Sequence, residues 1–391
     1  MDQFQTIETQ SYFQRLKSSL GGVLIGLLFF GGSFVLLWKN EGNFARERAA
    51  IKELTAATVE GSAERISPDT VGKPLHIISE IRSVEQLGDT GYLRPGSFLK
   101  LTRVAEMFQW VEVEHSETRE KMGGGSETVK SWSYEQKWQA GRVDSGSFQR
   151  PAGHENPQPK LSRAEFAVAE SSFGVWNGGD VLDHLAADEP LSLTTDMLDS
   201  GGAGGQLEGD YLYFRRSATS AGSTIGDERL SWQVLLPGTF SVIARHDPGN
   251  RLTAWTASNG KEKFLVDAGA LGTAELIARE QSAQSLFAWI LRGAGFLMMW
   301  LGLGLILAPL AMLLAIIPPV ASVGRFAIGM ITFVVALGLS LATIVIGWVA
   351  HNPVVLGVAV VAGLGVAFWW LRRRSAAALP RDPLAAAIQP G

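Results

Sequence analysis

The sequence predicts an α+β membrane protein with four transmembrane helices and a large β-rich extracytoplasmic domain between the first and the second helix. Two observations support this fold class. Residues 286–371 are almost entirely apolar, and residues 21–38 form an uncharged apolar stretch. A bilayer core of about 30 Å needs about 20 apolar residues in a helix. Each apolar run is therefore long enough, or nearly so, to span a membrane.

The composition fits a helix bundle joined to a soluble domain. The chain has 391 residues, 46% of them hydrophobic, and a formal net charge of −4. Because no basic stripe is present, we expect no nucleic-acid partner. The chain contains no cysteine, which excludes disulfides, cysteine-ligated metals and a thiol nucleophile.

A polar segment, residues 1–20, opens the chain and is expected in the cytoplasm. The apolar run 21–38 then predicts transmembrane helix 1. The alternative is a cleaved signal peptide, which has a shorter apolar core of about 7–15 residues and a small-residue cleavage site. Here the run ends at Trp38-Lys39 and no such site follows, so we favour an uncleaved helix.

Residues 39–281 predict a β-rich soluble domain with a helical stalk at each end, because residues 44–58 and 271–285 have helical character. Between the stalks, short runs of alternating apolar and polar residues, bounded by Gly, Pro and Asp, predict half-buried strands. These runs are residues 76–81, 98–101, 108–114, 211–215, 229–235, 239–245 and 263–266.

Other parts of this region predict helices and loops. We expect weak helices at residues 166–169 and 179–185. Glycine-rich composition predicts flexible loops at residues 123–126 and 201–205.

Three further transmembrane helices are expected at residues 286–317, 326–350 and 354–371, followed by a cytoplasmic tail, residues 372–391. The first of these ends at Pro318-Pro319 and a polar spacer. Arg292 is the single charge near these helices, and we expect it to snorkel to the membrane surface. No acidic intramembrane partner for it is evident in the sequence, which argues against a transporter or a proton path.

The distribution of basic residues predicts the orientation, because Lys and Arg favour cytoplasmic loops. The arginines of residues 372–381 and Arg325 place both termini inside and the domain outside. Basic residues within 39–52 outnumber those before the first helix and argue for the opposite orientation. Long domains translocate largely regardless of such charges. We therefore expect an integral membrane protein whose domain lies in the periplasm of a bacterium, or in the lumen of the endoplasmic reticulum or nuclear envelope of a eukaryote.

Residues 107–114 are a candidate strand for binding a partner or a lipid. Alternation puts Phe108 and Trp110 on one face and Met107 and Gln109 on the other. We favour an internal strand whose Phe and Trp side chains fill the core.

A metal site could be built from His115 with Glu112, Glu114 and Glu117. Metal ions need convergent ligands, whereas alternation puts His115 on the face opposite to Glu112 and Glu114. We expect no metal here and attribute these residues to a solvated strand end.

His154 and Glu155 are acid–base side chains that stand directly before Asn156-Pro157. Asn-Pro favours a turn, and we expect these side chains to stabilise it by hydrogen bonds. No serine-hydrolase, phosphate-binding, zinc-protease or dinucleotide-binding motif is present. The sequence predicts no catalytic residue and no cofactor.

Small residues recur four positions apart in the apolar runs, a spacing that lets helices approach closely. The pairs are Gly22 with Gly26, Gly338 with Ala342, and Ala359 with Gly363. They are the candidate contacts for self-association through the membrane helices.

Several motifs together resemble one known family. The exit from the first helix, GSFVLLWKNEG at residues 32–42, is followed by Asn43 where the family usually has Arg. The other motifs, in order, are residues 101–110 (LTRVAEMFQW), Trp138, residues 145–148 (SGSF), 153–157 (GHENP), 226–232 (GDERLSW), 241–245 (SVIAR), Glu280 and residues 291–295 (LRGAG). Their order and spacing resemble the transmembrane protein 43 (LUMA) family over nearly the whole chain.

The resemblance implies a modest set of functional expectations. Animal members of the family lie in the inner nuclear membrane and endoplasmic reticulum, are implicated in envelope organisation and self-associate. The Ala- and Gly-rich composition favours a bacterial member. We expect a non-enzymatic multipass membrane protein that acts as a self-associating scaffold in envelope organisation. Its expected partners are the lipid bilayer, copies of itself and unidentified proteins that bind the domain. The alternatives are a transporter or channel accessory subunit, and a membrane-bound hydrolase based on His154 and Glu155.

Overall fold

The computed structural model describes residues 3–121, 125–199, 204–216, 222–313 and 318–377. The chain folds into two compact units. The β-rich unit comprises the segment up to residue 21, residues 48–284 and residues 309–325, and the helical unit comprises residues 22–47, 285–308 and the chain from residue 326 onward.

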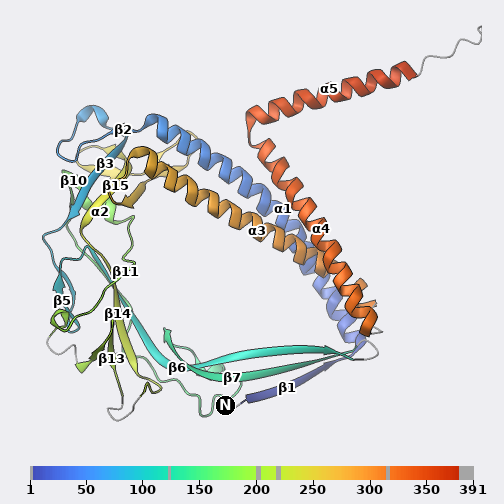
Figure 1. Ribbon diagram of the computed structural model, residues 1–391, viewed down its shortest axis with the longest axis horizontal. Coiled ribbons are helices and arrows are strands. Elements are labelled where there is room, and N and C mark those ends of the chain that lie inside the picture. Colours follow the sequence, from blue (N-terminus) through green and yellow to red (C-terminus); the bar gives the residue numbers. More distant parts are fainter. Residues whose placement is uncertain (1–2, 122–124, 200–203, 217–221, 314–317, 378–391) are drawn as a thin grey trace, which may run out of the picture. The chain divides into compact units, whose positions relative to one another are not determined.

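The larger sheet of the β-rich unit has the strand order β1-β7-β6-β14-β13-β12 (Figure 1). Two short strands lie off this path, because β8 pairs with β6 and β11 pairs with β14. The strands are β1 Gln3–Gln10, β6 Lys100–Glu120, β7 Ser126–Ala140, β8 Ala164–Ala167, β11 Glu189–Pro190, β12 Gln206–Glu208, β13 Tyr211–Phe214 and β14 Glu228–Leu235.

The second sheet has the strand order β10-β9-β3-β15-β16, with β19 on β15 and β2 in parallel on β3. Its strands are β2 Val59–Glu60, β3 Pro74–Arg82, β9 Ser172–Phe173, β10 Trp176–Asn177, β15 Gly238–Asp247, β16 Arg251–Thr253 and β19 Leu265–Ala268. Two further pairs are β4 Leu87–Asp89 with β5 Leu93–Gly96, and β17 Trp255–Thr256 with β18 Glu262–Lys263. Within the described residues, the short helical elements are α2 Gly178–Leu182 and 3₁₀ turns at Pro68–Thr70, Ser145–Ser147 and Thr195–Met197.

Each sheet of the β-rich unit has its own apolar core. Ile77, Phe173 and Val242 are completely buried in the second sheet, and Trp232 is buried in the larger one. The alternating burial of β14 explains why its sequence pattern predicts a strand so clearly. Burial of these apolar surfaces provides most of the stability of the unit.

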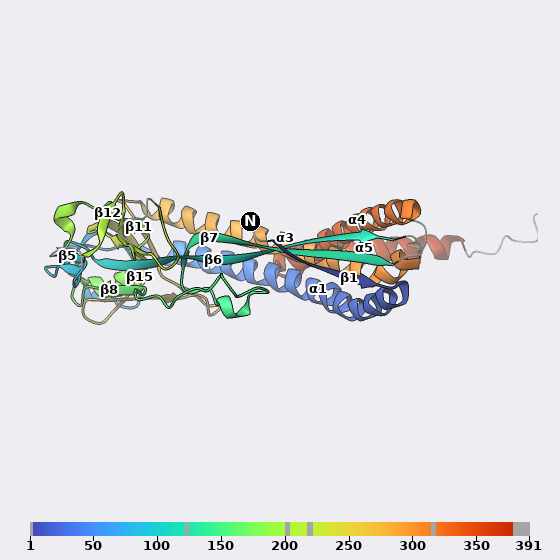
Figure 2. The same cartoon turned by 90° about the horizontal axis from the view of Figure 1, so that it is seen from below.

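Strands β6 and β7 form a long antiparallel arm, residues 106–120 and 126–140, in which Glu106 pairs with Ala140 and Glu120 with Ser126. Figure 2 shows these two strands running side by side with β1 next to them. Strand β1 pairs with the outer part of β7, from Gln10 at Ser126 to Gln3 at Ser133. The residues that precede the first apolar run therefore extend the larger sheet.

Four long apolar helices confirm the predicted class. They are α1 Tyr12–Ala57, α3 Thr273–Leu313, α4 Pro318–Ala350 and α5 Pro353–Ala377. All four are long and apolar enough to cross a membrane. The chain is thus an α+β membrane protein with one such helix before its β-rich region and three after it.

Several local predictions differ from the structure. Residues 318–325 are the start of α4, not a spacer, which is physically reasonable because Pro fits the first turn of a helix, where its missing N–H has no intrahelical partner. The helix expected at 166–169 is wrong, since Ala164–Ala167 pairs with β6 as strand β8. Residues 123–124, 201–203, 314–317 and the tail beyond residue 377 lie outside the described residues.

Helices α1 and α3 approach closely within the helical unit. A Cβ added to Gly26 would lie 2.8 Å from the carbonyl oxygen of Gly302, and one added to Gly302 would lie 2.7 Å from the backbone nitrogen of Phe30. Leu37, Met299 and Ala336 form a small buried core in this unit. The Gly26 position of the predicted small-residue pair is therefore used inside one chain.

Candidate functional site

An ion pair joins two helices of the helical unit. Glu41 on α1 accepts hydrogen bonds from Arg292 on α3, with Nε to Oε1 at 2.7 Å and Nη2 to Oε2 at 2.8 Å. The side chains are 1% and 13% exposed, respectively. This two-pronged geometry is the strongest that an arginine and a carboxylate form. The prediction that Arg292 has no acidic partner is therefore wrong.

Asn40 extends this pair to the backbone of α3. Its amide nitrogen donates to the carbonyl oxygen of Ala288 at 3.2 Å and to Glu41 Oε1 at 3.4 Å. Asn40 is 5% exposed and Glu41 is 2% exposed. Buried polar groups must be hydrogen-bonded, and these two residues meet that requirement through α3.

The end of α4 completes the cluster, which we call the polar node: Asn40, Glu41, Arg292 and His351. His351 Nδ1 hydrogen-bonds the carbonyl oxygen of Gly347 at 2.8 Å, and its ring lies edge-on to Trp38 at 5.0 Å. A Cβ added to Gly42 would lie 2.7 Å from His351 Nε2. Trp38, Asn40, Glu41 and Gly42 therefore form one contact surface toward α3 and the residues that end α4.

Aromatic rings flank the arginine of the polar node. The Arg292 guanidinium carbon lies 4.7 Å from the ring centre of Trp289 and 5.4 Å from that of Phe44. Such cation–π contacts stabilise a cation that has lost its water. Arg292 is thus held by a carboxylate and two rings, in place of the expected free extension to the membrane surface.

The polar node is a buried, hydrogen-bonded ion pair that holds two helices together, and we refer to this role as a clamp. Removing an ion pair from water is costly, and the cost is recovered only with good geometry and additional hydrogen bonds. Both conditions are met, because both Glu41 oxygens accept from Arg292 and one also accepts from Asn40. The ion pair fixes the position of α1 along α3. His351, directly after α4, packs against the same stretch of α1.

The predicted acid–base pair, His154 and Glu155, lies in the β-rich unit. His154 is 6% exposed, its ring stacks on Tyr134 at 3.8 Å, and its Nδ1 hydrogen-bonds the carbonyl oxygen of Arg150 at 3.1 Å. Trp110 lies edge-on to it at 4.8 Å. The imidazole is enclosed by rings and backbone, so it packs against the arm as a structural side chain.

Glu155 is exposed and stabilises the turn, as expected. Its carboxylate accepts a hydrogen bond from the backbone N–H of Gly153 at 3.1 Å. Backbone N–H groups of Glu155 and Gly153 hold the pKa of this carboxyl below its usual value. His154 is thus buried and Glu155 exposed, although the two residues are neighbours in the sequence.

Asn156 fixes this loop to the arm. Its amide nitrogen donates to the carbonyl oxygens of Trp110 at 2.9 Å and Val143 at 3.2 Å, and its amide oxygen accepts from Trp110 N at 2.8 Å. The residue is 6% exposed. The conformation of the GHENP stretch follows from these bonds.

The four residues considered for a metal site are not brought together. Glu112 Oε2 accepts from Tyr134 Oη at 2.8 Å and from Gln149 N at 2.7 Å, whereas His115 is exposed and Glu117 pairs with Arg119. Burial and the bond to Glu112 raise the pKa of Tyr134. Among the described residues, no group of three or more potential ligands is positioned to hold a metal ion.

The prediction for residues 107–110 is partly wrong. Met107 and Gln109 are the buried side chains, at 2% and 0% exposed, and Gln109 bonds the backbone of Gly141 and Val143. Phe108 and Trp110 are only half-buried. These residues of β6 belong to the arm, which extends beyond the apolar core of the sheet. Their aromatic face therefore packs on Trp138 and His154.

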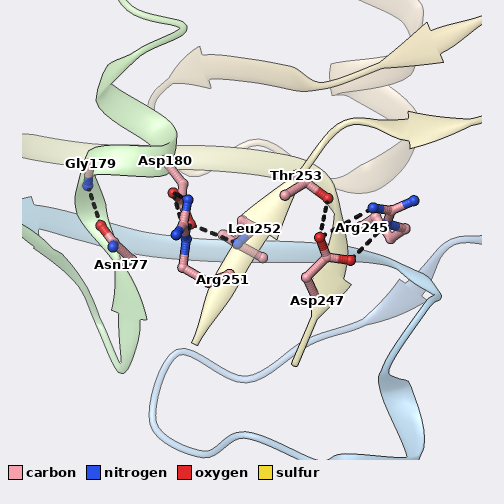
Figure 3. A network of polar contacts seen from close by, with 8 residues as sticks. All are labelled: Asn177, Gly179, Asp180, Arg245, Asp247, Arg251, Leu252 and Thr253. Atoms are coloured by element: carbon pink, nitrogen blue, oxygen red, sulfur yellow. Dashed lines mark hydrogen bonds and ion pairs between the residues drawn. The ribbon is translucent and has the colours of Figure 1, made fainter. Parts of the chain in front are cut away.

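A network of ionic contacts stabilises one end of the second sheet (Figure 3). Asp180 on α2 accepts from Arg251 Nε at 2.8 Å and from Leu252 N at 2.9 Å. Next to it, Asp247 accepts from Arg245 Nε at 2.9 Å and from Thr253 at 2.9 Å. The hydrogen bond from Arg245 holds the pKa of Asp247 below its usual value. Each carboxylate has a structural partner, so the network fastens α2 to β16.

The histidines of the second sheet are also bonded. His76 is 3% exposed and bridges Glu60 Oε2 at 2.8 Å and the carbonyl oxygen of Leu271 at 2.9 Å. Burial acts to raise the pKa of Glu60, but hydrogen bonds from His76 and Thr273 lower it overall. This contact joins the strand that follows α1 to the residues that precede α3.

Comparison with known proteins shows similarity over nearly the whole chain. The profile of the family described as Transmembrane protein 43 matches residues 107–353. The chain is 28% identical to "Transmembrane protein 43" of Rattus norvegicus over 356 residues, which covers 88% of this chain and 87% of the relative. It is 27% identical to the Homo sapiens protein of the same name, covering 93% and 92%. It is also 27% identical to the "Transmembrane protein 43 homolog" of Drosophila melanogaster, covering 93% and 97%. No solved structure matches.

Proposed function

Because this chain belongs to the transmembrane protein 43 family, whose relatives match it nearly end to end, we propose that it is a non-enzymatic membrane scaffold. The polar node and the Gly26–Gly302 contact hold α1, α3 and α4 in one bundle. This bundle presents the β-rich domain and self-associates through its exposed helix faces, in support of membrane or envelope organisation.

The observation that supports self-association is the difference between the three small-residue pairs. Gly26 is used inside the chain, against Gly302. In contrast, no described atom lies within 4 Å of a Cβ added to Gly338 or Gly363, and Ala342 and Ala359 are exposed. Small residues on an apolar helix allow a second helix to pack closely. No residue of the most apolar stretch of α5 is buried. The Ala359–Gly363 face of this helix is the proposed contact between two copies.

Structural roles for the polar side chains support a function without catalysis. Both candidate acid–base residues have structural contacts: the His154 ring stacks on Tyr134, and the Glu155 carboxylate accepts a hydrogen bond from the Gly153 backbone. In the polar node, both carboxylate oxygens of Glu41 accept hydrogen bonds from Arg292. Partners are then expected to recognise the surface of the β-rich domain, and lipid to cover the apolar helices.

We further propose an orientation in which the tail lies in the cytoplasm and the domain outside it. The basic residues from Arg372 onward support this, because such residues favour the cytoplasmic side. In a bacterium the domain would be periplasmic, anchored to the inner membrane. In a eukaryote the protein would lie in the endoplasmic reticulum or inner nuclear membrane, with the domain in the lumen.

Single cysteines test the proposed contact, because the chain has none of its own. Gly363→Cys places a thiol on the proposed face of α5. Gly357→Cys is the matched control, since six helical residues place it on a different face and it too has open space around it. We expect disulfide-linked dimers in native membranes for Gly363→Cys and few for Gly357→Cys. Equal cross-linking at both positions, or none at either, contradicts the proposed contact.

One observation favours a transporter or channel accessory subunit as the second candidate. Ionisable side chains within membrane helices often mark a transport path, and Glu41 and Arg292 are such side chains. If they serve transport, Glu41→Gln abolishes a measurable ion or substrate flux in vesicles while the amount of folded protein stays unchanged. If they serve as a clamp, the variant loses thermal stability, and neither the wild type nor the variant shows a flux.

A further inference from the structure

His76 lies where the end of α1 and the start of α3 meet in the β-rich unit. Strand β2, which follows α1, pairs in parallel with β3, so that Glu60 stands opposite His76. His76 Nδ1 lies 2.8 Å from Glu60 Oε2, and Nε2 lies 2.9 Å from the carbonyl oxygen of Leu271, just before α3. We call these two bonds the His76 contact. Both ring nitrogens of a residue that is 3% exposed therefore face an oxygen.

Neither oxygen of the His76 contact can donate a hydrogen bond. A backbone carbonyl oxygen is an acceptor, and so is an ionised carboxylate. Burial acts to raise the pKa of Glu60, but hydrogen bonds from His76 and Thr273 bring it below its usual value, so Glu60 is ionised at neutral pH. A neutral imidazole has one N–H, and only the doubly protonated ring donates from both nitrogens. The complete contact therefore requires a positively charged His76.

The segment that leads into α3 is held by bonds of the same kind. Ser241 on β15 donates to the carbonyl oxygen of Gly269 at 2.7 Å and accepts from Leu271 N at 2.7 Å. Thr273, the first residue of α3, donates to Glu60 Oε1 at 2.8 Å. Residues 269–273 therefore depend on Ser241, Glu60 and the donor that His76 supplies.

A buried apolar cluster from both helices surrounds Leu271. Its members on α1 and α3 are Ala50, Ile51, Leu54, Leu276 and Ile277. The bond from His76 to the Leu271 carbonyl is buried, and a buried carbonyl without a donor is unfavourable. When His76 keeps a single ring proton, either this carbonyl or the carboxylate of Glu60 loses its donor.

Glu60 is the one charged group that contacts His76 among the described residues. His246 on β15 stands on the opposite face of that strand from Ile243, the residue paired with His76. The charged side chains on the surrounding elements are exposed or bonded elsewhere: Lys52 is exposed, Glu53 bonds Ser258, Arg245 pairs with Asp247, and Arg279 pairs with Asp267 and Glu275. The charge of His76 is therefore balanced by Glu60.

We propose that the His76 contact is a proton-dependent connection between the strand after α1 and the start of α3, complete when His76 is doubly protonated and weakened when it is neutral. An unperturbed histidine titrates at about pH 6.5, which makes this side chain suited to respond near neutral pH. The contact is complete on the acid side of the titration of His76 and is lost as the pH rises through it. It is lost again only when Glu60 takes up a proton, below about pH 4. The pH of the compartment that holds the domain then controls how firmly residues 269–273 are held.

A spin label beside Leu271 tests this response in the full-length protein in lipid. Gly272→Cys provides the only thiol, and a Cβ at this position meets no described atom within 4 Å. The pH is varied from about 5.5 to about 8.5, on either side of the titration of ordinary histidine. In parallel, ¹⁵N-labelled histidine shows by NMR whether both ring nitrogens of His76 carry protons. We expect the label to become more mobile over the same pH range in which His76 loses its second proton, and a control label at Val84→Cys, 96% exposed, to stay unchanged.

Two variants distinguish the proton-dependent contact from ordinary packing. Glu60→Gln removes the negative charge beside the imidazolium from a side chain that is 73% exposed, so we expect the change in mobility to move to lower pH. His76→Gln cannot donate to both oxygens in the way that the imidazolium does, and it should leave the label mobile at every pH. The matched control is His115→Gln, at an exposed histidine of the arm, which should keep the wild-type response.

Three results would overturn the proposal. They are a single ring proton on His76 at the acid end of the titration, a label whose mobility stays constant while His76 titrates, and a pH response that persists in His76→Gln. If His76→Gln does not fold, Glu60→Gln decides, because an unshifted response in that variant also overturns the proposal. Each readout concerns one chain, so the scaffold proposal is tested separately.

Discussion

The Glu41–Arg292 pair shows what single residues contribute and why the sequence concealed it. The two residues are 251 positions apart, and Glu41 lies just beyond the apolar run that ends at Trp38. The helical stalk predicted at residues 44–58 belongs to the same helix, because α1 continues to Ala57. Arg292 was identifiable as an unusual charge, but only the packing of α1 on α3 could reveal its carboxylate.

A double-mutant cycle measures the contribution of this pair. Glu41→Leu and Arg292→Leu each leave one buried charge without its partner, which typically costs about 3–5 kcal/mol. The double variant Glu41→Leu/Arg292→Leu leaves no unpaired charge, and we expect it to lose much less than the sum of the single variants. Free energies of unfolding in a detergent titration check this. Additive losses, or single variants that match the wild type, would mean that the pair is not a clamp.

Asp247 gives a prediction of pH dependence in the β-rich unit (Figure 3). Its folded-state pKa is lowered, first by the hydrogen bond from Arg245. A lowered carboxyl pKa contributes stability that is present above the unfolded pKa, about 3.9, and is lost as the pH falls through the folded value. Thermal unfolding from pH 7 downward should therefore show a loss of stability below about pH 4. Asp247→Asn should make that loss shallower, and an unchanged pH profile would show that Asp247 does not contribute.

At the scale of elements, regular patterns were predictable and long-range pairings were not. The strict alternation of Glu228–Leu235 marks β14, and its burial alternates accordingly. Strand β7 was missed, although Trp132, Tyr134 and Trp138 stand at even spacing within it. Its polar residues resemble a loop, because most of the arm has no core to face. The partner of β1 is 116 or more residues away in register, which local propensity cannot indicate.

The contact between α1 and α3 gives a prediction at the element scale. In Gly26→Ala the new Cβ would lie 2.8 Å from a backbone oxygen of Gly302, which cannot move aside as a side-chain end could. We expect overpacking to cost about 1–3 kcal/mol. Gly31→Ala, in the same helix, meets no described atom within 4 Å and should be neutral or gain up to about 1 kcal/mol. Unfolding in detergent measures both, and equal stabilities would contradict the close approach.

For the whole molecule, hydropathy and motif order together predicted the class and the family. Four apolar helices of sufficient length are present, and the family profile covers residues 107–353. The motif WKNEG at residues 38–42 helps to build the polar node: Asn40 and Glu41 contact α3, and Trp38 and Gly42 contact His351, directly after α4. Hydropathy could not predict the pairing of residues 3–10 with β7, because it measures insertion into lipid and not the pairing of strands.

Self-association of the full chain is the central claim of the proposed function, and its stoichiometry in lipid is the most direct test. Native mass spectrometry of the wild-type protein, extracted with its lipids, counts the copies in each particle. We predict a homo-oligomer for the wild type and a shift toward monomer for Gly363→Leu, whose side chain fills the open face of α5. A wild-type chain that is monomeric at every concentration tested would contradict the scaffold proposal.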